Sequence, residues 1–224
     1  MDVALRSNQR LGAWVAFVVF FATLAYAGNL AEEGDAGEPL YEPEFFVASV
    51  FGFGLLAGAA FLIAIRLDKR EAFALRRPSS WKRAAGIAFL VFVGVLVVSG
   101  VLGLFVDAAE EQGLLPETWP PPDVPVFALN ALAVVVGAAT AEELLFRGIG
   151  YSLLERFGTP IAVVGSAAAW AAAHGLVAGF PLIFAFGVGL GLLRRFTGSI
   201  VPCLLLHALF NAFALAAAAY SSTS

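Results

Sequence analysis

Apolar residues are concentrated in seven long runs, and short polar links separate one run from the next. An unpaired backbone N–H or C=O group is costly in hydrocarbon, so a spanning segment must be a helix or part of a closed barrel. The runs lack the apolar-polar alternation of barrel strands. The sequence therefore predicts an all-α, polytopic membrane helical bundle with about seven transmembrane helices. The predicted spans cover residues 11–30, 44–65, 84–106, 125–146, 161–178, 180–193 and 199–220.

The length of the chain limits what else it can contain. A spanning helix needs about 20 residues, so seven helices use about 140 of the 224. The remainder suffices for short loops, and we therefore expect a single integral membrane domain over residues 1–224. The run at 180–193 is short and follows Gly179, with Pro181 at its start. This region is either a tight hairpin or one broken segment.

Composition supports the membrane assignment and excludes other classes. Hydrophobic residues make up 60% of the chain and charged residues 13%, whereas soluble domains have about 45–50% and about 25%. The net charge of −4 gives no sign of a nucleic-acid partner. The single cysteine, Cys203, excludes an intrachain disulfide and a cysteine metal cluster. It is expected to be a small buried hydrophobe.

Charges are distributed unequally between alternate loops. Residues 66–83 carry seven Lys and Arg, whereas residues 31–44 carry six acidic residues and residues 107–124 carry five, neither with a base. The positive-inside rule places the basic loop in the cytoplasm. Arg6, Arg10, Arg156, Arg194 and Arg195 then fall on the same side. The predicted topology is N-in and C-out, in the cell membrane.

The first apolar run has a second interpretation. Residues 1–27 combine Arg6 and Arg10, an apolar run and the sequence Ala25-Tyr26-Ala27, which together resemble a cleavable signal peptide. The run is long for a signal peptide, so a retained first helix is favoured.

Other residues in the runs predict packing. Gly54 and Gly58, like Gly187 and Gly191, are spaced for close approach of two helices. Trp14, near the start of the first run, and Trp81 and Trp119, in the loops before the third and fourth runs, fit anchors at the membrane interface.

Polar and ionisable residues within the runs are the strongest indication of function. Each ionisable group costs about 2.5–3.5 kcal/mol at the bilayer centre, so it is retained for a reason. Glu143 and Arg147 are spaced i,i+4 in the order that favours an ion pair. His207 and Asn211 have the same spacing and share one helix face. The full set is Glu142, Glu143, Arg147, His174, His207 and Asn211.

These residues are expected to lie at similar depths. At 1.5 Å per residue, Glu142 and His174 lie about 21 Å from the cytoplasmic boundary, His207 about 12 Å and Asn211 about 18 Å. One site in the cytoplasmic half or near the midplane can therefore collect them, opening toward the cytoplasm.

The residue types suit acyl hydrolysis. A glutamate in a partly dry cavity can act as general base for water, and an imidazole can hold that water. A second imidazole and an amide can donate to a developing oxyanion. No intramembrane Asp accompanies either histidine, so a Ser-His-Asp triad is excluded. Zinc would need Glu142, His174 and His207; the sequence lacks H-E-x-x-H, and metal binding stays open.

The motifs resemble those of a known family. Glu-Glu-x-x-x-Arg at 142–147, aromatic-x-x-x-His at 170–174 and His-x-x-x-Asn at 207–211 are similar, in order and on separate helices, to the CPBP intramembrane proteases. These are the CAAX proteases and bacteriocin-processing enzymes, or Abi family, similar to the Ras-converting CAAX endopeptidase. The resemblance makes residues 125–220 a catalytic helical core. Residues 1–124, with three helices, carry no motif.

The resemblance implies roles for individual residues. Glu142 and His174 would activate water, His207 and Asn211 would form the oxyanion hole, and Glu143 and Arg147 would support the site or the substrate terminus. Trp170 stands where the family usually has Phe, which could reshape the substrate groove.

The implied function is an intramembrane endopeptidase. It would cleave near the C-terminus of a membrane-embedded peptide or lipidated protein, such as a prenylated one. The implied mechanism is glutamate-type and needs no cofactor, although the family has also been described as metal-dependent.

Two other functions compete with the endopeptidase. The motifs could persist in a non-catalytic scaffold or an immunity-type protein that binds peptides. Buried Glu and His also make proton relays in transporters. However, the sequence shows no inverted repeat.

Overall fold

A computed structural model describes residues 2–31, 39–106 and 119–221, and these residues form helices without a strand. Six helices are long and apolar enough to cross a membrane, and a seventh apolar helix, α9, has 15 residues. The predicted all-α polytopic membrane fold is confirmed. The helices outside the 124–157 segment are α1 (Asp2–Ala31), η1 (Pro39–Tyr41), α2 (Pro43–Ile63), α3 (Lys69–Ala72), α4 (Trp81–Leu102), α9 (Thr159–Ala173), α10 (Phe180–Thr197) and α11 (Val201–Ser221).

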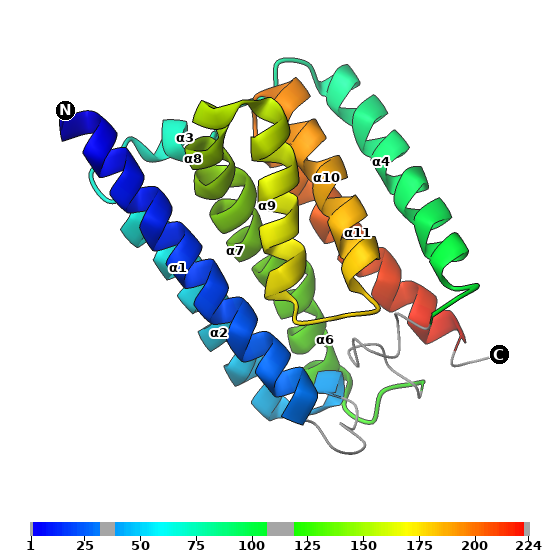
Figure 1. The fold of residues 1–224 in the computed structure, drawn as a ribbon. Coiled ribbons are helices and arrows are strands. Elements are labelled where there is room, and N and C mark those ends of the chain that lie inside the picture. Colours follow the sequence, from blue (N-terminus) through cyan, green and yellow to red (C-terminus); the bar gives the residue numbers. More distant parts are fainter. Residues whose placement is uncertain (1, 32–38, 107–118, 222–224) are drawn as a thin grey trace.

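The connections gather at two ends of the bundle. The first residues of α1, α3, the turn before α9 and the α10–α11 turn lie at one end, and the α9–α10 turn and the last residues of α11 lie toward the other (Figure 1). The basic segment 66–83 therefore shares an end with Arg156 and Arg194, as the charge pattern predicts. Most of the acidic loops, at 32–38 and 107–118, lie outside the described residues. Which end faces the cytoplasm stays a prediction.

The fourth span is longer than predicted. Instead of ending at residue 146, the helix continues to Phe157 and covers 34 residues. The prediction was wrong because Arg147 looked like the polar end of the run, whereas its charge is paired inside the helix. Two stretches have π-helical hydrogen bonding, which is often found at functional sites. The segments are α6 (Val124–Leu132), η2 (Ala133–Ala138), α7 (Ala139–Glu143), η3 (Leu144–Gly150), α8 (Tyr151–Leu154) and η4 (Glu155–Phe157).

The fifth and sixth runs form a hairpin of two antiparallel helices, α9 and α10 (Figure 1). Helix α9 ends at Ala173, short of the predicted residue 178, because Gly175 adopts a φ of +70° that stops a right-handed helix. Of the two alternatives raised by the sequence, the structure has the tight hairpin.

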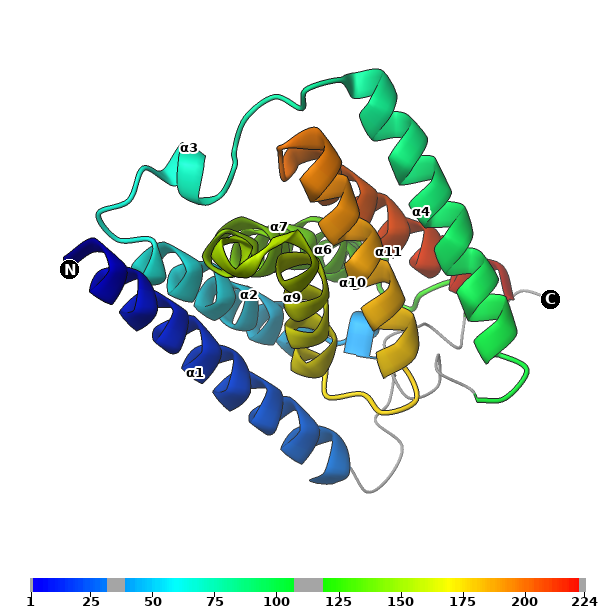
Figure 2. The ribbon, with the colours of Figure 1, turned by 45° about the horizontal axis from the view of Figure 1, so that its top comes forward.

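The bundle has α1 and α4 at opposite sides, with α9 and α10 between them (Figure 2). The main core includes Phe146, Trp170, Phe186 and Cys203, and Cys203 is fully buried as expected. Trp14 is also buried, with 3% of its surface exposed, so its prediction as an interfacial anchor was wrong. Trp81 and Trp119 remain exposed.

Only one of the two glycine pairs packs closely. A Cβ atom on Gly187 would lie 3.0 Å from the Cβ of Ala167 in α9, and one on Gly191 would lie 3.1 Å from Val163. Around Gly54 and Gly58 a Cβ would meet nothing within 4 Å, so the predicted close packing there is wrong. The spacing alone does not reveal whether a neighbouring helix lies on that face.

This difference gives a matched pair of variants. Gly187→Ala should lower the free energy of unfolding by about 1–3 kcal/mol, because the added methyl would lie 2.9 Å from Arg147 Nη2 and 3.0 Å from the Ala167 Cβ and would overpack this contact. Gly54→Ala should be neutral or stabilising, since alanine favours a helix by up to about 1 kcal/mol and has free space there. Thermal unfolding of both variants in detergent checks this. Equal effects would contradict the observed packing.

Candidate active site

A buried ion pair lies in the middle of the long helix. Arg147 Nη1 donates to Glu143 Oε1 at 3.1 Å, and neither side chain is exposed. The Arg147 guanidinium also lies 4.3 Å from the centroid of the Trp170 ring on α9, a favourable cation–π contact. The predicted i,i+4 pair is therefore confirmed, and it links the long helix to α9.

His207 of α11 lies between the two glutamates. Its Nδ1 is 3.1 Å from Glu143 Oε1, and its Nε2 is 3.8 Å from Glu142 Oε2. The His207 side chain is 4% exposed. Two residues predicted from different spans are therefore adjacent, and both nitrogens of the ring face carboxylates.

Trp170 occupies the centre of the cluster. Its indole N–H donates to Glu142 Oε2, a bond that phenylalanine at this position could not make. The ring centroid is 5.0 Å from that of His174 and 5.2 Å from that of His207. The residue that departs from the usual family motif thus contacts both histidines and a glutamate.

His174 and Asn211 lie at the edge of this cluster. His174 is the C-cap of α9, and its Nδ1 is 2.8 Å from the Trp170 carbonyl oxygen. Its ring contacts the cluster by packing edge-to-face on the Trp170 ring. Asn211 Nδ2 donates to the Val134 carbonyl at 3.1 Å. The structure brings together directly Glu142, Glu143, Arg147, Trp170 and His207, and it adds His174 and Asn211 at the periphery.

An apolar cavity of about 110 Å³ adjoins the cluster. Trp170, His207 and Asn211 form the polar part of its wall, and the remaining lining residues are apolar. The cavity is smaller than the roughly 300–1,000 Å³ of typical ligand pockets, but it shares their apolar lining with few polar groups at one side. The apolar lining residues are Val134, Leu182, Ile183, Phe186, Phe210, Ala214 and Leu215.

The groups considered for zinc make other contacts within the protein. Within residues 2–31, 39–106 and 119–221, no three His, Cys, Asp or Glu side chains are grouped so that they could hold a metal ion. Nδ1 of His174 faces a helix carbonyl and Nδ1 of His207 faces Glu143. The zinc set considered from the sequence, Glu142, His174 and His207, stays a prediction.

Sequence reasoning missed some residues of the site. Phe186 lines the cavity, with its ring 5.8 Å from His207 and 4.6 Å from Phe210. The chain has 21 phenylalanines, and nothing in the sequence separates a cavity-lining phenylalanine from a lipid-facing one.

Comparison with known families supports the motif resemblance. Residues 124–213 match the family described as type II CAAX prenyl endopeptidase, Rce1-like. The matched segment contains every polar residue of the cluster. Neither a curated protein nor a solved structure matches the chain.

Proposed function

We propose, from the premise that this chain belongs to the CAAX protease family through residues 124–213, that it cleaves a peptide bond near the C-terminus of a membrane-associated substrate. The family supports CAAX-type intramembrane endopeptidase activity in general, and the six apolar helices support a multi-pass integral membrane protein. The observation that carries the finer proposal is the contact of Glu142 with His207 and Trp170 beside an apolar cavity.

Glu142 is the proposed general base. Its side chain is 13% exposed, unlike the fully buried Glu143, so water can approach it. Glu142 would take a proton from a water held also by His174, and the water oxygen would attack the scissile carbonyl carbon. The proton would then pass to the departing amine as the C–N bond breaks.

Asn211 and His207 are the proposed oxyanion donors. Asn211 uses one N–H on the Val134 carbonyl, and its amide carries a second N–H on the cavity wall. His207 Nε2 lies on the side of the ring away from Glu143 and would donate to the oxyanion when it carries a proton. Each such donor contributes about 3–4 kcal/mol of transition-state stabilisation.

Glu143, Arg147 and Trp170 are proposed to position the reacting groups. Glu143 accepts from Arg147 and lies 3.1 Å from His207 Nδ1, so it would fix the orientation of the imidazole. Trp170 donates its indole N–H to Glu142, and its ring makes edge-to-face contacts with the rings of His174 and His207. Because these contacts come from three helices, they fix the site with little freedom.

The size and lining of the cavity favour a substrate with an apolar side chain next to the cleaved bond. A cavity of about 150 Å³ holds one benzene ring, so about 110 Å³ suits a single medium-sized apolar side chain. A longer lipid chain, such as a prenyl group, would extend beyond it toward the bilayer. We propose cleavage at the cytoplasmic side of the cell membrane.

Filling the cavity should impair binding of such a residue. Ala214→Phe places a ring in the cavity. For a peptide with a leucine next to the cleaved bond, we expect KM to rise about 10-fold or more. The reason is that a lost apolar contact costs about 1.5–3 kcal/mol. Ala212→Phe is the control, since residue 212 is exposed on another face of α11. Similar KM values for the two variants would contradict the assignment of the cavity.

One assay tests the proposal as a whole. Purified protein in bicelles is given quenched fluorescent peptides, prenylated and unprenylated, with and without a strong chelator. Chelator-resistant cleavage that Glu142→Gln removes is the expected result. Chelator-sensitive cleavage restored by zinc would replace the glutamate-type mechanism with a metal-dependent one. Peptide binding without cleavage would favour the scaffold function.

A further inference from the structure

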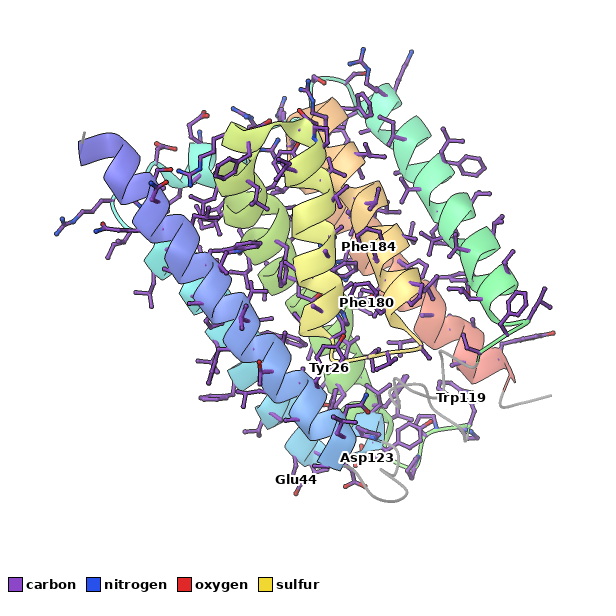
Figure 3. The ribbon with its side chains drawn as sticks, viewed as in Figure 1. Tyr26, Glu44, Trp119, Asp123, Phe180 and Phe184 are labelled. Atoms are coloured by element: carbon purple, nitrogen blue, oxygen red, sulfur yellow. The ribbon has the colours of Figure 1, made fainter. Side chains whose placement is uncertain are left out.

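The side chains at the end of α1 hold the turn that follows His174. Asn29 Nδ2 donates to the Gly175 carbonyl at 3.0 Å, and Tyr26 Oη donates to the Leu176 carbonyl at 3.3 Å. Tyr26 extends from α1 toward the end of α9 (Figure 3). These two carbonyls lie directly beyond α9, so α1 supplies donors for backbone that the helix no longer satisfies.

The backbone of α1 also touches this turn. A Cβ atom on Gly175 would lie 2.5 Å from the carbonyl carbon of Ala25, and the residue has a φ of +70°. Only glycine satisfies both conditions. The turn therefore has one closely fitted position against α1.

His174 depends on the same turn. It caps α9, its backbone N–H donates to Ala171, and its ring is held by the Trp170 carbonyl and the Trp170 ring. The residue after it is Gly175, which α1 holds. A displacement of the turn would therefore move the imidazole.

A second contact of α1 reaches the other half of the cluster. Trp14 Nε1 donates to the Leu145 carbonyl at 3.0 Å, and Leu145 lies between Glu143 and Arg147 in the π-helical segment. A Cβ on Gly150 would lie 2.6 Å from the indole ring, so Trp14 lies directly on the backbone of this segment. The contact restricts rotation of the helix that carries the glutamates.

We propose that α1 is a positioning helix for the active site, in which Asn29 and Tyr26 set the place of His174 and Trp14 sets the place of Glu142, Glu143 and Arg147. The positions 14, 26 and 29 span about 22 Å along a helix, so one rigid element fixes both halves of the site. The inference has two consequences. The expected change in kcat rests on the proposed function, whereas the expected movement of the histidine side chains does not.

The structural consequence can be measured without a substrate. The chain has two histidines, so histidine labelled at Cε1 gives two imidazole NMR signals, assigned with His174→Ala and His207→Ala. Ring currents of Trp170 make the His174 signal sensitive to small movements. Asn29→Ala and Tyr26→Phe should shift the His174 signal and leave the His207 signal in place. Trp14→Phe should shift the His207 signal, because His207 contacts Glu143.

The kinetic consequence is a change in kcat without a change in KM. A misplacement of about 1 Å can reduce catalysis about 100-fold, so we expect Asn29→Ala to lower kcat by about 10- to 100-fold with KM within about twofold. Thr23→Val is the matched control, since its hydroxyl donates within α1 to Val19 and the residue is exposed. It should leave both the signals and kcat unchanged.

The two readouts separate the inference from the proposed function. If the histidine signals move as expected and the wild type cleaves no peptide, the positioning role stands and the proposed function fails. If the wild type cleaves peptides but Asn29→Ala and Tyr26→Phe leave the His174 signal and kcat unchanged, the positioning role of α1 is refuted. The positioning role is also refuted if Asn29→Ala lowers kcat no more than Thr23→Val does.

Discussion

Glutamine in place of Glu142 is expected to reduce kcat for peptide cleavage by about 10²- to 10⁴-fold, the usual contribution of a general base. Glutamine keeps the shape of the side chain and can still accept from the Trp170 N–H, but it cannot take a proton from water. Folding should be preserved, because Glu142 is part-exposed and carries no buried ion pair with Arg147. Initial rates at saturating peptide check the expectation.

A second glutamate in the same segment is the matched control. Glu155 lies in η4 and is exposed, so Glu155→Gln removes the same charge far from the histidines. We expect its kcat to equal that of the wild type. Cleavage by Glu142→Gln at the wild-type rate would exclude Glu142 as the base and require another group to activate water.

Arg147→Leu is expected to lower the free energy of unfolding by about 3–5 kcal/mol, because it leaves the Glu143 carboxylate buried without its partner. The arginine side chain is fully buried and also faces the Trp170 ring. The double variant Glu143→Leu, Arg147→Leu should recover much of this loss, since neither charge then remains. Unfolding followed by tryptophan fluorescence in mixed micelles measures both variants.

The chain contains an exposed ion pair of the same length as a comparison. Arg76 Nη1 lies 3.1 Å from Glu71 Oε2, with side chains 48% and 72% exposed. Arg76→Leu removes this pair, worth about 0–1 kcal/mol in water, and the hydrogen bond from Nε to the Gly198 carbonyl, worth about 1 kcal/mol, so the total loss should stay below about 2 kcal/mol. Equal losses for Arg76→Leu and Arg147→Leu would mean that burial does not determine the strength of the inner pair.

The sequence by itself determined the helical membrane fold and the polar residues of the candidate site. Long apolar runs require helices because backbone polar groups cannot stay unpaired in lipid. Ionisable residues inside such runs are costly, so Glu142, Glu143, Arg147, His174 and His207 could be identified one by one. The i,i+4 spacing also predicted the Glu143–Arg147 pair, since it depends only on local helix geometry.

Only the tertiary structure decided which apolar face meets protein and which meets lipid. Both environments are equally apolar, so hydrophobic periodicity does not mark the interface between helices in a membrane. For that reason the sequence could not distinguish Gly187 from Gly54, or the buried Trp14 from the exposed Trp81.

The sequence also left two interpretations open for α1, a retained helix and a cleaved signal peptide. Its Ala25-Tyr26-Ala27 sequence fits a cleavage site, whereas in the folded protein Tyr26 donates to Leu176 and Ala25 lies against Gly175. Such contacts join residues about 150 positions apart in the sequence, and no local pattern specifies them. The polar residues of the candidate site were therefore recognisable from local sequence, while the contacts that hold them were decided by the packing of distant helices.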